Sequence, residues 1–150
     1  MKTKIILVLI SVLLVFNIGF SAVSKGARKT RKVESVRQRV MNTYWKLKDI
    51  SGEDVSGKGI TLDFGKNEVS GKSGVNNYFG DYRIIKNKIS ISKLGVTSKA
   101  GSKELMELEA DYLDILQSVE IIEVKGNKLI LKNAAGDVLT FIQDKSHTLY

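Results

Sequence analysis

The side chains best suited to chemistry gather in one stretch, residues 69–84, where polar residues are interspersed with glycine. Asn76, Asn77 and Tyr78 stand together there, and their amides and hydroxyl could bind a small polar ligand. Acid–base catalysis would also need a base within hydrogen-bonding reach. The only histidine, His147, lies close to the end of the chain. The sequence therefore gives these three residues as candidates for binding and predicts no catalytic residues.

The composition removes several other kinds of chemistry. The chain has no cysteine, so it can form no disulfide, no thiolate metal site and no cysteine nucleophile. With one histidine it cannot build a histidine-rich metal centre, and a Ser-His-acid triad is disfavoured. We therefore expect a protein that is not an enzyme and that holds no metal and no cofactor.

The same stretch is rich in glycine. Gly71, Gly74 and Gly80 fall where the hydrophobic pattern of one strand ends and that of the next has not yet begun. Because glycine tolerates positive φ, we interpret the three as structural turn residues rather than as part of a flexible linker. Replacing Gly74 or Gly80 is accordingly expected to impair folding rather than activity.

The excess positive charge is confined to the N-terminal part of the sequence. The net charge of the chain is +8, yet residues 44–150 hold 15 basic and 15 acidic side chains. Nucleic-acid binding would need basic residues on a folded face, preferably among aromatic residues. Here the surplus positive charge lies in residues 1–43, and residues 25–43 include no aromatic residue. We therefore expect no nucleic-acid partner.

Residues 1–24 have the three-part plan of a secretory signal. A basic start is followed by an apolar run over residues 5–20 and by small residues, with a predicted cleavage site near Ser24. Basic residues directly after the run resist translocation, so an uncleaved inner-membrane anchor formed by residues 5–20 remains an alternative, as does an inverted domain that faces the cytoplasm. The favoured interpretation is export to the periplasm or cell surface.

Residues 25–43 read as a basic linker. Val33, Val36 and Val40 could share one helix face, but three valines make a weak apolar stripe. We favour a solvated linker over an amphipathic segment, residues 25–40, held on an anionic membrane surface. The residues that would contact such a membrane are Arg28, Lys29, Arg31, Lys32, Arg37 and Arg39.

From Tyr44 onward the hydrophobic pattern changes to that of strands. Apolar and polar residues alternate in short runs that are separated by Gly- and Asn-containing turns. One helix interrupts the series at about residues 103–118, with Ser102 as its N-cap. This order predicts a mainly β (α+β) domain over residues 44–143, an antiparallel meander curled into an open barrel with one packed helix. A signal or anchor helix would precede it, and residues 144–150 are expected to form a loose tail.

The predicted helix separates its residues into two faces. Leucine, isoleucine and tyrosine side chains occupy one sector, and an acidic stripe occupies another. The stripe could hold a cation or a basic partner, but we favour a solvated face. Glu109 lies at the edge of the apolar sector, and we expect it to bond to a neighbouring strand or loop. The acidic stripe consists of Glu104, Glu107, Asp111 and Asp114.

Several short motifs follow one another in a distinctive order: Trp45-Lys-Leu47, Ile60-Thr-Leu-Asp-Phe64, Gly74-Val-Asn-Asn-Tyr-Phe-Gly80, the helix segment 109–116 and Gly126-Asn-Lys-Leu-Ile-Leu131. Together they resemble a META domain, the module of the HslJ-type bacterial heat-shock and envelope proteins, over about residues 44–143. The resemblance implies a small β-rich domain of the cell envelope with a role in stress tolerance and no catalytic residues.

The sequence departs from this family at two positions. Many members carry Gly-Cys-Asn where this chain has Gly74-Val75-Asn76, and a second cysteine where it has Gly101. Whatever that pair does in relatives, this protein lacks it, and packing of Val75 must replace part of its contribution.

The favoured function is that of a monomeric, exported, non-enzymatic envelope protein that binds an unidentified protein partner. One alternative is a lipocalin-like carrier with a small ligand inside the barrel, and another is a membrane-tethered inhibitor or interaction module. A short chain with large inward residues would fill its own interior, which disfavours the carrier. The residues expected to point inward are Trp45, Phe64, Phe79 and Phe141.

Overall fold

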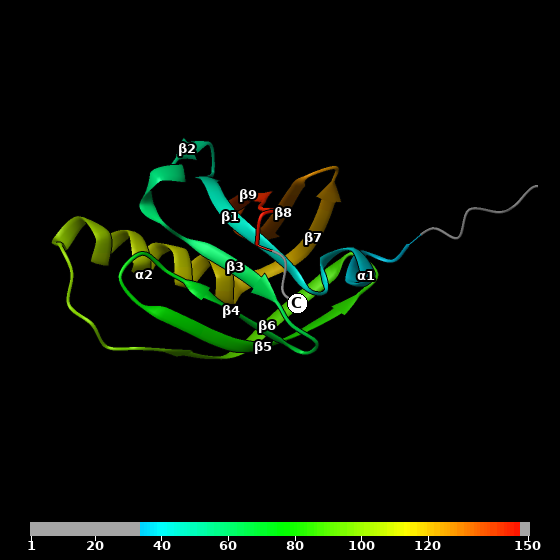
Figure 1. Ribbon diagram of the computed structural model, residues 1–150, viewed down its shortest axis with the longest axis horizontal. Coiled ribbons are helices and arrows are strands. Elements are labelled where there is room, and N and C mark those ends of the chain that lie inside the picture. Colours follow the sequence, from blue (N-terminus) through cyan, green and yellow to red (C-terminus); the bar gives the residue numbers. More distant parts are fainter. Residues whose placement is uncertain (1–33, 148–150) are drawn as a thin grey trace, which may run out of the picture. The chain divides into compact units, whose positions relative to one another are not determined.

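The computed structural model describes residues 34–147 (Figure 1). The predicted signal or anchor of residues 1–24 and the first nine residues of the predicted linker, 25–33, lie outside this range. Neither helix within it is long and apolar enough to cross a membrane. The elements are α1 (Val36–Val40), β1 (Thr43–Ile50), β2 (Glu53–Asp54), η1 (Ser56–Lys58), β3 (Thr61–Phe64), β4 (Glu68–Lys72), β5 (Asn77–Ile85), β6 (Lys88–Val96), α2 (Lys103–Ser118), β7 (Val119–Lys125), β8 (Lys128–Asn133) and β9 (Val138–Gln143).

The strands form an antiparallel meander that closes on itself. Neighbouring strands pair in the order β1-β3-β4-β5-β6-β7-β8-β9, and β1 also pairs with β9, while β2 is a short addition to β1. β6 and β7 are joined by a single residue pair, Lys88 with Ile121, so the barrel is open at this seam. α2 connects these two strands and packs against β6 and β8. The predicted fold class is confirmed.

Aromatic side chains fill the interior of the barrel. The rings of Tyr78, Tyr112 and Phe141 meet edge to face, with centroids 5.8 and 6.4 Å apart along the series. Trp45 is also fully buried, as is Phe64. The expected inward position of Phe79 is wrong: its side chain is 60% exposed, because β5 begins at Asn77 and alternation turns residues 78, 80, 82 and 84 inward.

The end of the predicted linker belongs to the folded domain. Ser35 and Gln38 form a capping box at the start of α1, and Val40 is completely buried. Arg37 donates to the Lys66 carbonyl at 2.8 Å, and Arg39 donates to the Val124 carbonyl at 2.7 Å. These two arginines therefore bond to the barrel, whereas the sequence pattern suggested a membrane or solvent. Residues 25–33, with the other four basic candidates, lie outside the described residues.

The first part of the predicted loose tail is attached to β1. The Asp144 amide donates to the Tyr44 carbonyl at 2.9 Å, and its carboxylate pairs with Lys46 at 2.8 Å. The His147 ring lies against the Tyr44 ring with centroids 4.2 Å apart. Asp144 to His147 thus lie along the domain, and residues 148–150 lie outside the described range.

Only one of the three predicted turn glycines lies in a turn. β4 ends at Lys72 and β5 begins at Asn77, so the loop contains residues 73–76, where Gly74 has φ of 121°. Gly71 and Gly80 lie within strands. A Cβ at Gly71 would overlap the Thr61 carbonyl oxygen, and one at Gly80 would come within 3.0 Å of the Ser92 carbonyl oxygen. These two glycines allow backbones to approach closely, which is a different reason for their presence.

Candidate functional site

The polar loop of residues 73–76 is held by the carboxylate of Glu109 from α2. One carboxylate oxygen accepts hydrogen bonds from the Ser73 hydroxyl at 2.5 Å, the Val75 amide at 3.2 Å and the Asn76 amide at 2.8 Å. The other accepts from the Asn76 side chain at 2.7 Å. Burial acts to raise the pKa of Glu109, but the hydrogen bonds from Ser73 and Asn76 outweigh it and hold the pKa below its usual value. The predicted bonding of Glu109 to a neighbouring loop is confirmed.

Asn76, the first binding candidate, uses its side-chain hydrogen-bonding groups for contacts within the protein. Its side-chain oxygen accepts from the Thr97 hydroxyl at 2.8 Å and from the Lys99 amide at 2.7 Å. Its side-chain nitrogen donates to Glu109 and to the Lys99 carbonyl at 3.2 Å. The residue is only 3% exposed. Every polar atom of this side chain therefore has a partner within the protein, and its role is to join the loop, α2 and the segment after β6.

Tyr78 is also a core residue. Its hydroxyl donates to the Thr61 carbonyl at 2.7 Å and lies 2.8 Å from the Tyr112 hydroxyl. Burial raises the pKa of both phenols well above the usual value. A phenol that stays protonated and bonded inside the barrel cannot act as a base or nucleophile at neutral pH. Among the three candidates, only Asn77 is exposed.

Asn77 lines a surface hollow of about 420 Å³ that sequence reasoning missed. Asp63 and Tyr44 lie directly opposite each other on β3 and β1, and the docked tail brings His147 to the same hollow. Burial raises the pKa of Asp63, and one of its oxygens is buried with no hydrogen-bond partner among residues 34–147. The position of His147 near the end of the sequence concealed this juxtaposition.

Two of the four residues of the acidic stripe on α2 form ion pairs. Glu104 contacts Lys58 at 2.5 Å, and Glu107 lies 3.6 Å from Lys103. Between residues 34 and 147, no group of three or more acidic or histidine side chains lies close enough to hold a metal ion.

A different surface has the features of a binding site: the outward side of the β5–β6 hairpin. We call it the hairpin face, formed by Phe79, Asp81, Arg83 and Ile85 on β5 and by Lys88, Ser90 and Ser92 on β6. Phe79 and Ile85 are both 60% exposed and stand near opposite ends of β5. The Phe79 ring covers Gly95, because a Cβ there would lie only 2.5 Å from the ring. The face thus has an apolar side chain toward each end.

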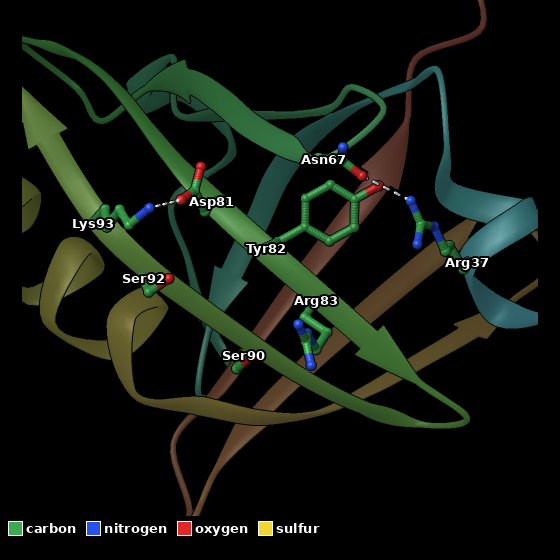
Figure 2. A pocket seen from close by; sticks show the side chains of 8 residues that line it. All are labelled: Arg37, Asn67, Asp81, Tyr82, Arg83, Ser90, Ser92 and Lys93. Carbon is green, nitrogen blue, oxygen red and sulfur yellow. Dashed lines mark hydrogen bonds and ion pairs between the residues drawn. The ribbon is translucent and has the colours of Figure 1, made fainter.

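The centre of the hairpin face is polar and hollowed (Figure 2). The register places Arg83 opposite Ser90 and Asp81 opposite Ser92, and Lys93 pairs with Asp81 at 2.7 Å. These residues line a hollow of about 570 Å³ together with Tyr82, Asn67 from the β3–β4 turn and Arg37 from α1. β4 begins at Glu68, which pairs with Asp81, whereas β5 continues beyond Asp81 to Ile85. The last part of β5 therefore has no β4 residue beside it, and α1 and the turn before β4 border the hollow there.

A second hollow of about 360 Å³ continues the first toward the hairpin turn. Arg83 and Ser90 line both hollows, and Ile85 and Ile89 supply apolar surface to the second. Sequence reasoning missed this face because it interpreted Gly71, Gly74 and Gly80 as turn residues and assigned Phe79 to the core. Alternation counted from Asn77 would have placed residues 79, 81, 83 and 85 on one outward side.

Val75 and Gly101, the two positions at which the family resemblance would place cysteine, are adjacent in space. A Cβ added at Gly101 would lie 2.5 Å from a methyl group of Val75. The valine therefore occupies the space that glycine leaves open, as a large–small pair.

Comparison with known proteins places the chain in a family. The META domain family matches residues 38–146. An NMR structure of a protein from Burkholderia xenovorans is 26% identical, with a TM-score of 0.60 over 72% of this chain and 86% of that chain. Another NMR structure is 18% identical, with a TM-score of 0.60 over 73% of this chain and 95% of that chain.

A third solved structure, a duf4847 family protein from Bacteroides vulgatus, is 13% identical and shares the fold, with a TM-score of 0.57 over 74% of this chain and 99% of that chain. No curated protein matches the sequence closely enough to count as a relative. The family match covers the barrel, α2 and the loop that Glu109 holds, and on this ground the chain belongs to the META domain family.

Proposed function

We propose that this protein is an exported, non-enzymatic module of the bacterial cell envelope that binds a protein partner through the hairpin face. One observation carries the proposal: Phe79 and Ile85, two large apolar side chains, are 60% exposed on the same side of one strand. Exposed apolar surface beside polar groups is typical of interaction sites. The two hollows between and beside these residues could accommodate side chains of a partner.

The proposal that the protein is not an enzyme is supported by the burial and internal hydrogen bonding of the polar residues at and next to the 73–76 loop. Asn76 and Tyr78 are buried and bonded within the protein, and Glu109 is an acceptor for the loop. A general base needs free access to substrate and a pKa near the working pH. The pKa of Glu109 is lowered, in the opposite direction from that of a catalytic carboxyl tuned toward neutrality.

A lipocalin-like carrier is less well supported. Such a protein binds its ligand inside the barrel, and here the interior positions are occupied by Trp45, Phe64, Tyr78, Tyr112 and Phe141, all at most 1% exposed. A membrane-tethered interaction module is compatible with the same hairpin face and differs only in whether residues 5–20 are cleaved. Export rests on the sequence of residues 1–24, and a stress-related role rests on the family.

The test compares partner capture by matched variants in the native bacterium. Cells producing the wild-type chain, the double variant Phe79→Ser/Ile85→Ser or the control Met106→Ser are treated with a lysine-reactive crosslinker. Met106 is 39% exposed on α2, so the control also removes an exposed apolar side chain. We expect one specific adduct with wild type and with the control, and its loss in the double variant. Equal adducts in all three chains would refute the proposal.

Export is tested separately by N-terminal sequencing of the native protein and by its accessibility to a protease added outside the inner membrane. A new N-terminus near Ser24 supports cleavage, and an intact Met1 with an accessible domain supports the anchor. A domain protected from the protease would refute export.

A further inference from the structure

We propose that Arg83 binds a carboxylate of the partner, assisted by the hydroxyls of Ser90 and Ser92, and that the hollow beside Ile85 takes an aliphatic side chain two residues away. The partner segment would be extended and would carry an acidic residue and an aliphatic residue at positions i and i+2. This inference rests on the proposed function and specifies the chemistry of the segment bound.

Arg83 and Lys88 are the cations of this face that have no ion pair within residues 34–147, and of the two only Arg83 lies opposite a serine. Lys93 is paired with Asp81, and Arg37 donates to the Lys66 carbonyl and to the Asn67 side chain. Within residues 34–147, the Arg83 guanidinium has no hydrogen bond or ion pair, and the same holds for the Ser90 and Ser92 hydroxyls. Figure 2 shows these side chains without a connecting dashed line. A guanidinium carries five N–H donors in a planar fork, so a carboxylate can bind it with two parallel bonds.

The register places the hydroxyls beside the guanidinium. Ser90 is the cross-strand partner of Arg83, and Ser92 is the partner of Asp81, one step along the same outward side. Opposite residues of an antiparallel pair have Cβ atoms about 4.5–5.5 Å apart. A carboxylate held by Arg83 is therefore within reach of a hydroxyl donor as well. The Asp81 carboxylate pairs with the Lys93 ammonium rather than with the Arg83 guanidinium.

Charge complementarity favours an acidic occupant. Four basic side chains and two acidic ones line the two hollows together. This surplus of positive charge attracts any anion, and the apolar surface of the second hollow beside Arg83 suits a peptide with an aliphatic side chain better than a phosphate group. We therefore assign the site to protein carboxylates rather than to phosphate groups of a lipid headgroup or a nucleotide.

The spacing of the face defines the pattern in the partner. Arg83 and Ile85 are two residues apart on one strand, which corresponds to about 6.6–6.8 Å. An extended peptide repeats its side chains on one side at the same interval. Ile85 and Ile89 give the second hollow an apolar wall, suited to leucine or isoleucine. A segment lying along β5 can thus place a carboxylate over Arg83 and an aliphatic group over Ile85 at once.

The experiment measures binding of fluorescently labelled heptapeptides to the purified full-length chain by polarisation. The probe is Gly-Ser-Glu-Thr-Leu-Ser-Gly. One comparison peptide has Gln in place of Glu, and another has Glu and Leu adjacent. The variants are Arg83→Gln, Ile85→Ser and the control Lys128→Gln, whose exposed cation lies at the start of β8, away from the face.

We expect Arg83→Gln and the Gln peptide each to weaken binding about tenfold, as loss of a charge-assisted bond implies. The variant Ile85→Ser should abolish the preference for the i, i+2 spacing, and Lys128→Gln should bind the probe like wild type. Binding of the Gln peptide as tightly as the Glu peptide, or unchanged binding by Arg83→Gln, would overturn the inference. So would tighter binding to inorganic phosphate or to vesicles of anionic phospholipid than to the probe.

The outcome is separable from that of the proposed function. The probe peptide could show no binding while the Phe79→Ser/Ile85→Ser variant still loses its adduct in cells. In that case the hairpin face binds a partner of other chemistry, and only the carboxylate assignment is wrong. If both experiments fail, the proposed function fails as well.

Discussion

Replacing Glu109 with glutamine should destabilise the domain far more than the loss of one charge would suggest. In the wild type, both oxygens accept, one from three donors of the 73–76 loop and the other from the Asn76 side chain at 2.7 Å. A glutamine that keeps its oxygen toward the three donors turns its NH₂ group toward the Asn76 nitrogen, so two donors face each other. Asn76 cannot rotate to relieve this, because its oxygen accepts from Thr97 and Lys99.

Two effects contribute to the expected loss of stability in Glu109→Gln. Three charge-assisted bonds become ordinary ones, and a buried donor of Asn76 loses its acceptor; together these should lower the free energy of unfolding by about 3–4 kcal/mol. The measurement is urea denaturation of wild type, Glu109→Gln and the control Glu107→Gln at pH 7. Glu107 is exposed, with a single ion pair at 3.6 Å, so its variant should lie within about 0.5 kcal/mol of wild type.

The pH dependence gives a second readout of the same contacts. The folded pKa of Glu109 is lower than its unfolded value, so the stabilisation that it provides is present above the unfolded pKa. It is lost as the pH falls through the folded pKa, because the protonated carboxyl no longer accepts from all four donors. The gap between wild type and Glu109→Gln should therefore narrow in acid. If the free energy of unfolding of Glu109→Gln at pH 7 were within about 1 kcal/mol of that of wild type, the role given to Glu109 would be refuted.

Three further predictions concern substitutions elsewhere in the domain. Gly71→Ala should destabilise the domain by about 2–3 kcal/mol, because its Cβ would overlap the Thr61 carbonyl oxygen; a denaturation midpoint equal to that of wild type would contradict this. The double variant Val75→Cys/Gly101→Cys should form a disulfide under oxidising conditions and gain about 3 kcal/mol that reductant removes, since the two positions are adjacent; failure to oxidise would show that they are not. Asp63→Asn should be more stable than wild type at pH 7, because burial raises the folded pKa of Asp63 and so makes its ionised form unfavourable; the advantage should shrink as the pH falls, and a less stable variant at pH 7 would contradict the assignment.

The sequence was sufficient for the features that depend on local periodicity. Alternation and turn residues specify the meander, and the helix from Lys103 to Ser118 follows from its cap and its apolar sector. The place of Glu109 at the edge of that sector was enough to predict a bond to a neighbouring loop. These inferences succeed because hydrophobic period and capping act within a few residues.

The features that were missed depend on contacts between distant segments. α1 has five residues, and its docking depends on carbonyl groups at Lys66 and Val124, which no local pattern indicates. The tail is fixed by a bond to Tyr44, far away in sequence. The hairpin face was missed for a different reason: Phe79 was expected in the core among turn glycines, whereas β5 already begins at Asn77, so strand alternation turns Phe79 outward.

The measurement that tests the account most directly is a photo-crosslinking scan around the barrel in living cells. A photoreactive amino acid is placed at five exposed positions: Phe79 and Ile85 on the hairpin face, and Met106, Lys128 and Met41 elsewhere. The account predicts a partner adduct at positions 79 and 85 and none at the other three. An adduct of equal yield at all five positions, or one confined to positions away from the hairpin face, would contradict it.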